Sequence, residues 1–137
     1  AISERDEEIM QRWTSALHLA GAYDDSDKAC LAFQQRFPQS TLMPAVLFAF
    51  AENSYFRIVA MEKHPDQAIK AKELPKLFEE TTKRFRTVIE KYPEYPKINV
   101  ARYSLGLTLH RQGDLKGALK ALSEIPLPER TGEVAMT

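Results

Sequence analysis

The sequence contains one cysteine, Cys30, and only three histidines and five glycines among its 137 residues. A single cysteine excludes an intramolecular disulfide and a metal site built from several thiolates. His18, His64 and His110 have no second ligand at metal spacing on the same predicted helix, so we expect no zinc site. The chain also lacks a glycine-rich phosphate loop and a nucleophile elbow. We therefore expect neither catalysis nor a bound cofactor or metal, and we interpret Cys30 as a core residue, with a reactive thiol as the alternative.

Net charge and long apolar runs are absent as well. The 19 basic and 19 acidic residues cancel, so no electropositive face is indicated for nucleic acid. The longest apolar stretch, Met43 to Ala51, is about half of the roughly 18 residues that a membrane helix needs, so we expect no membrane insertion by this segment. The first residue is alanine, and we expect a processed chain or an excised part of a longer one, with any signal peptide out of view.

Helical periodicity dominates what is present, most clearly in residues 99–125. Gly113 and Asp114 interrupt this stretch with the residue types of a turn. Apolar residues recur at helical spacing on both sides of the turn: Ala101, Leu105, Leu109, Leu115, Ala118, Leu119 and Leu122. The pattern predicts two antiparallel helices.

The N-terminal residues predict another pair of helices. Ser3 is expected to cap the first, whose apolar positions are Ile9, Trp13, Ala16, Leu17 and Ala20. Residues 24–27, Asp-Asp-Ser-Asp, are typical of a turn and an N-cap, so we expect the second helix to begin there. That helix should end before Phe37 and Pro38.

A third pair is predicted in the middle of the chain. Pro44 suits the first turn of a strongly apolar helix. Its packed side is expected to contain Val46, Leu47, Phe50, Ala51 and Ser54. Residues 63–66 should end this helix, and Asp66 is expected to cap a short one that reaches Leu74. Pro75 is then expected to start or kink a helix that runs to Lys91, which gives six to seven helices in all.

Three segments share one spacing pattern, in which small residues occupy fixed positions on paired helices. Its elements here are Trp13, Ala29-x3-Phe33, Thr81-x3-Phe85, Leu105-Gly106 and Ala118-x3-Leu122. Aromatic-proline pairs end the second helix of two units, at Phe37-Pro38 and Tyr92-Pro93. This pattern resembles the tetratricopeptide repeat, a helix-turn-helix unit of about 34 residues.

The resemblance implies an all-α fold: a single domain over residues 1–137 in which antiparallel helix hairpins form a right-handed solenoid. The expected repeats span about residues 10–43, 44–98 and 99–130. The middle repeat has 30 residues between Ala51 and Thr81, where the last repeat has 12 between Gly106 and Ala118. An insertion of about 18 residues near 60–78 follows from this difference, and we expect it to lengthen both helices of that repeat.

The phrases FQQRFPQS and RTVIEKYPEYP resemble tetratricopeptide proteins of Gram-negative envelopes. The similarity is to the outer-membrane assembly lipoprotein family and to the periplasmic partner of the Tol-Pal system. Longer bacterial repeat proteins, including planctomycete ones, are similar too. In these longer proteins a stretch like RTGEVAMT opens a further helix, so we expect a fragment cut on its C-terminal side. The resemblance implies a noncatalytic scaffold in the periplasm that binds a peptide or helix of a partner protein.

In such arrays the first helix of each repeat lines a concave groove. The resemblance implies eight groove residues: Thr14, His18, Phe48, Glu52, Tyr55, Tyr103, Leu107 and His110. Phe48, Tyr103 and Leu107 have core packing as their alternative. The carboxylate-clamp function of one subgroup is not expected, because Thr14, His18, Ala49, Val100 and Ser104 occupy its binding positions.

Two other functions stay open. One is a structural repeat fragment that packs on the rest of its own chain or self-associates. The other, less supported by the sequence, is a small enzyme or ligand carrier that uses residues 62–75 as a lid.

Overall fold

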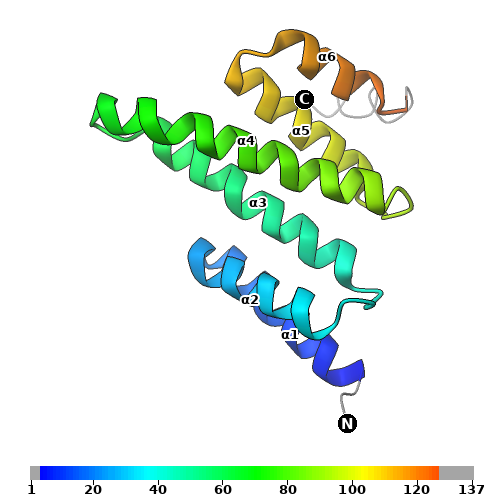
Figure 1. Cartoon of the computed structure of the whole chain (residues 1–137). Coiled ribbons are helices and arrows are strands. Elements are labelled where there is room, and N and C mark those ends of the chain that lie inside the picture. The colour runs from blue at the N-terminus through cyan, green and yellow to red at the C-terminus, as the bar shows by residue number, and fades with distance from the viewer. Residues whose placement is uncertain (1–3, 127–137) are drawn as a thin grey trace.

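The computed structural model describes residues 4–126, and all regular secondary structure in that range is helical. The six helices are α1 (Glu4–Leu19), α2 (Tyr23–Arg36), α3 (Met43–Glu62), α4 (Gln67–Lys91), α5 (Ile98–Gln112) and α6 (Leu115–Ser123). They form three antiparallel pairs stacked in chain order, with α1 and α2 at one end of the stack and α6 at the other (Figure 1). The predicted all-α fold is confirmed. Ser3 and the stretch RTGEVAMT lie outside the described residues.

Each helix packs on the next one along the chain, and α1 also packs on α3. A single apolar core joins the three pairs through fully buried residues such as Phe33, Val46 and Phe85. The expected packed side of α3 is confirmed, since Val46, Leu47, Ala51 and Ser54 are buried and Phe50 packs against the core. Phe37 and Tyr92 also pack on this core where α2 and α4 end.

The prediction for the start of α2 was wrong. α2 begins at Tyr23, and its N-cap, Ala22, makes no side-chain capping bond. Gly21 makes the preceding turn with φ of 78°, a conformation that glycine adopts without steric cost. Asp24 and Asp25 therefore lie in the first turn of α2, where carboxylates interact favourably with the helix dipole.

The second hairpin is longer than its neighbours, and its closed end extends beyond them (Figure 1). α3 has 20 residues and α4 has 25, and only residues 63–66 connect them. Asp66 caps α4 by accepting hydrogen bonds from the backbone of Ala68 and Ile69, as predicted. The long connection that a lid over residues 62–75 would need is not present, because most of those residues belong to α4.

Pro75 lies inside α4, so the expected helix boundary there was wrong. Proline removes one backbone donor, and the carbonyl that loses its partner belongs to Ala71. Ala71 is exposed, so water can take the place of the missing donor. One continuous helix therefore runs from the tip of the hairpin to Lys91.

Gly106 lies where the last two helices cross closely. A methyl group at Gly106 would come within 2.8 Å of Leu122 Cδ2, well inside normal contact distance. This agrees with the expectation that the small residues in the repeated pattern allow helices to approach.

Candidate functional site

Two of the eight predicted groove residues lie in the core. Thr14 is fully buried, and its hydroxyl donates a hydrogen bond to the Gln11 carbonyl. Phe48 is 6% exposed and packs against the rings of Phe85 and Tyr95. Neither side chain can reach a partner from these positions, because Thr14 lies at the α1–α2 contact and Phe48 lies between α3 and α4. They are corrected to core residues.

The other six predicted positions have solvent access. His18 and Glu52 are brought together by α1 and α3, with His18 Nε2 3.6 Å from Glu52 Oε1. Tyr55 on α3 accepts a 3.0 Å hydrogen bond from Arg111 Nε on α5. The remaining three lie along α5: Tyr103 and His110 are exposed, and Leu107 is half-buried. Their role in binding stays a prediction.

A hydrogen-bond network fixes His18. The Asn53 amide nitrogen donates to Ser26 Oγ and Asp27 Oδ1, so its oxygen is left to accept. His18 Nδ1 lies 2.7 Å from that oxygen and therefore carries the donated hydrogen. His18 Nε2 then points towards the Glu52 carboxylate.

Burial raises the pKa of Glu52 above its ordinary value of 4.5, although His18 and Lys97 oppose the shift. The folded state therefore holds a proton on Glu52 at pH values where the unfolded chain has released it. Because the folded state binds more protons there, the free energy of unfolding decreases as the pH rises from the unfolded pKa of Glu52 to its folded pKa. We expect the free energy of unfolding of the wild type to fall relative to that of Glu52→Gln as the pH rises above 4.5, and the difference to level off above the folded pKa. Urea unfolding of both proteins from pH 4 to pH 7 measures this, and a constant difference would contradict it.

Asp27 on α2 forms hydrogen bonds with side chains of both α3 and α4. Its carboxylate accepts hydrogen bonds from Arg57 and Asn53 on α3 and two from Arg84 on α4, at 2.8 to 3.1 Å. Arg84 also donates to the Phe50 carbonyl, and its guanidinium lies 3.6 Å from the centre of the Phe50 ring. This network holds the first hairpin rigidly against the second.

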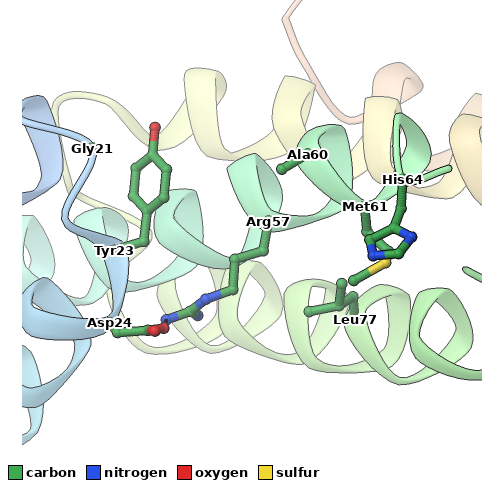
Figure 2. A pocket seen from close by; sticks show the side chains of 8 residues that line it. All are labelled: Gly21, Tyr23, Asp24, Arg57, Ala60, Met61, His64 and Leu77. Atoms are coloured by element: carbon green, nitrogen blue, oxygen red, sulfur yellow. Dashed lines mark hydrogen bonds and ion pairs between the residues drawn. The ribbon is translucent and has the colours of Figure 1, made fainter. Parts of the chain in front are cut away.

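A notch of about 420 Å³ lies next to this network, where the second hairpin extends past the first. We define the notch by its lining residues: Gly21, Tyr23, Asp24, Arg57, Ala60, Met61, His64 and Leu77. Figure 2 shows the Arg57 guanidinium reaching towards Asp24, with Met61, His64 and Leu77 together at the opposite end. The Arg57–Asp24 ion pair measures 2.7 Å. The notch thus has largely apolar walls and an ion pair at one side.

Aromatic contacts connect the notch with the predicted groove. Tyr23, which lines the notch, stacks on Phe56 of α3 with ring centroids 5.6 Å apart and an interplanar angle of 9°. The His18 ring contacts both of these rings, at 5.7 and 5.6 Å. Phe56 is 38% exposed. The notch therefore adjoins the face around His18 and Glu52.

The notch was not predicted from the sequence, because none of the eight predicted groove residues lines it. One signal was present: Arg57, Ala60, Met61 and His64 are spaced at three, four and seven residues, which places them on one side of a helix. The other wall comes from the turn at Gly21 and from α4, and sequence spacing does not show that these segments meet there.

The range that the structure describes also contains metal-ligating and nucleophilic side chains. Within residues 4–126, no three side chains of His, Cys, Asp or Glu are grouped so that they could hold a metal ion. Cys30 is fully buried, as expected, and burial together with the nearby Asp27 raises the pKa of its thiol to about 12. The thiolate is the reactive form, so the folded protein keeps this cysteine inert.

Comparison with models of protein families finds no match, and comparison with curated proteins finds none either. A search of the six described helices finds none that is both long and apolar enough to cross a membrane.

Proposed function

We propose that the chain is a noncatalytic protein-interaction module of the tetratricopeptide type, which holds a segment of a partner protein in the notch. The notch carries this proposal, because in it an apolar hollow meets the aromatic ring of Tyr23 and the charged Arg57–Asp24 pair. The sequence resemblance implies that the protein belongs to a bacterial envelope complex, and this location is part of the proposal.

The walls of the notch suit an apolar side chain of the partner. Tyr23, Ala60, Met61 and Leu77 provide apolar surface, and a methionine side chain adapts readily to different shapes. Binding of short protein segments depends mostly on a few anchor side chains buried in such hollows, with a polar rim that excludes water. The polar groups here are the Arg57–Asp24 pair and His64.

The rest of the segment would run along the adjoining face, past Phe56, His18 and Glu52 towards α5. Tyr103 is 41% exposed on α5 and provides another aromatic contact. Asp27 and its partners hold the first two hairpins in place, so both walls of the notch are preorganised. Preorganisation limits the entropy that binding loses.

The test uses peptides selected from a random phage-displayed library with the full chain as bait, and fluorescence anisotropy of the enriched peptides. Ala60 is an exposed residue on the notch wall, and Ala60→Trp would fill the hollow without disturbing the core. We expect this change to weaken binding at least about tenfold, a loss of about 1.4 kcal/mol. Ala71→Trp, at an exposed alanine of α4 outside the notch, should bind as the wild type does.

Two results would contradict the proposal: a library that yields no enriched peptide, or peptides that bind Ala60→Trp and wild type equally well. The double variant Glu52→Ala/Tyr103→Ala tests the adjoining face separately. We expect it to weaken binding while circular dichroism and melting temperature stay close to those of the wild type. Unfolding by this double change would show that these residues belong to the core instead.

A further inference from the structure

A second surface stands apart from the notch, on the side of the first hairpin that does not pack on α3. Ile9 is 55% exposed and Trp13 is 61% exposed, so two large apolar side chains one helical turn apart face solvent here. Beside them α1 and α2 enclose a hollow of about 440 Å³, lined by Met10, Trp13, Leu17, Asp25, Lys28, Ala29 and Ala32. We call this surface the outer face. It presents a large side chain and a hollow next to each other.

We propose that the outer face is the interface of a two-fold symmetric dimer of this chain. A two-fold contact requires a surface that is complementary to itself. Trp13 is the projecting apolar group of this patch, and Ala29 and Ala32 form the low part of the hollow beside it, because their side chains end at a single methyl group.

A hydrogen bond within the hairpin shows which residues of α1 and α2 lie at the same level. Ser26 Oγ donates to the Thr14 carbonyl at 3.0 Å, so residues 14 and 26 are level across the hairpin. Trp13 of α1 therefore lies at nearly the same height as the midpoint between Asp25 and Lys28 of α2. We place the two-fold axis at this height, in the plane of the interface and perpendicular to both helices. Each helix then packs antiparallel on the same helix of the second copy.

Charge complementarity supports this register. Asp25 and Lys28 are both exposed and lie three residues apart on the outer face of α2. The axis midway between them brings Asp25 opposite Lys28 of the second copy, and Lys28 opposite its Asp25. Both ion pairs form from one contact, whereas a parallel arrangement of the two helices in register would place like charges together. Such pairs fix register and orientation more than they add affinity.

The apolar residues fit the same arrangement. Ile9 and Leu17 are equally far from Trp13 along α1, so each faces the other across the axis. The two Trp13 rings lie near the axis and pack against each other. Burial of these exposed apolar groups is the driving force for association.

Trp13 is the only tryptophan of the chain, so its fluorescence reports on this face alone. We expect the molar mass of the full chain in sedimentation equilibrium to rise from monomer to dimer with concentration. The tryptophan emission should shift to the blue along the same curve. A chain that stays monomeric at all concentrations, or a dimer whose formation leaves the emission unchanged, would overturn the proposal.

Charge reversal tests the register. Asp25→Lys alone and Lys28→Asp alone should each weaken dimerisation at least about tenfold, because like charges then face each other. The double variant Asp25→Lys/Lys28→Asp restores opposite charges and should dimerise as the wild type does. Failure of the double variant to recover, with circular dichroism unchanged, would overturn the proposal.

Leu119→Glu provides the matched control, because Leu119 is 69% exposed on α6 at the other end of the stack. It should leave the dimer intact, whereas Trp13→Glu should abolish it. Loss of the dimer in Leu119→Glu would place the contact elsewhere and overturn the proposal. Neither change touches the notch, so failure of the dimer leaves the peptide-binding test unaffected.

Discussion

Replacing Asp27 with alanine is expected to lower the free energy of unfolding by about 3 kcal/mol, the lower end of the loss that follows when one partner of a buried ion pair is removed, because this pair is largely but not fully buried. The Asp27 side chain is 14% exposed, and that of Arg84 is 12% exposed. Without Asp27, Arg84 keeps Glu80 and the Phe50 carbonyl as partners. It loses the two hydrogen bonds that it donates to the two carboxylate oxygens of Asp27. Asn53 and Arg57 each lose a partner in the same change.

Asp24→Ala is the matched control, since Asp24 pairs with the same Arg57 at the surface. Its side chain is 88% exposed, and exposed ion pairs contribute about 0–1 kcal/mol. Urea unfolding followed by circular dichroism measures both variants. Equal losses in the two would mean that the network around Asp27 does not hold the hairpins together.

Replacing Phe85 with alanine is expected to cost about 3–5 kcal/mol, as large-to-small changes at buried aromatic residues do. Phe85 is fully buried on α4, and its ring packs edge-on against Phe48 of α3 at 6.2 Å. The core around it continues to Phe33 on α2 and to Leu105 on α5. The cavity would thus open where all three hairpins share one core.

Phe56→Ala removes the same ring from an exposed site. Phe56 is 38% exposed, so we expect less than half the loss of Phe85→Ala. Thermal or urea unfolding with two probes, far-ultraviolet circular dichroism and Trp13 fluorescence, measures the change. Separate transitions in the wild type would contradict a common core, because Trp13 lies in the first hairpin and most helical signal comes from the other two.

The helices were predictable from the sequence because their apolar spacing and their end signals agree. Asp66, Pro44 and Gly113 lie where caps and first turns need them, and the structure uses each in that way. The start of α2 was placed too late because Asp-Asp-Ser-Asp suits a cap, whereas Gly21 already makes the turn. Pro75 was expected to start a helix or to kink one. It lies inside α4, which continues because it packs along α3 and the carbonyl that loses its donor is exposed.

The site was less predictable because it depends on contacts between segments that are distant in the sequence. Asp27 meets Arg84 across 57 positions, and nothing in the local pattern of either residue indicates this pairing. Tyr23 and Leu77 share the notch only because the second hairpin extends past the first. Thr14, in contrast, was predicted to be a binding residue and is not accessible. Its position within a repeat suggested a groove, but the contact between α1 and α2 buries it.

Chemical-shift mapping by NMR is the most direct measurement of binding at the notch. Isotope-labelled full chain is titrated with an enriched peptide, and the changes in the backbone amide signals are assigned to residues. The proposed site predicts the largest changes at Tyr23, Arg57, Met61, His64 and Leu77, with weaker changes along α3 near Glu52. Changes concentrated at Trp13 and Lys28 on the outer face, or around Leu119 on α6, would contradict binding at the notch.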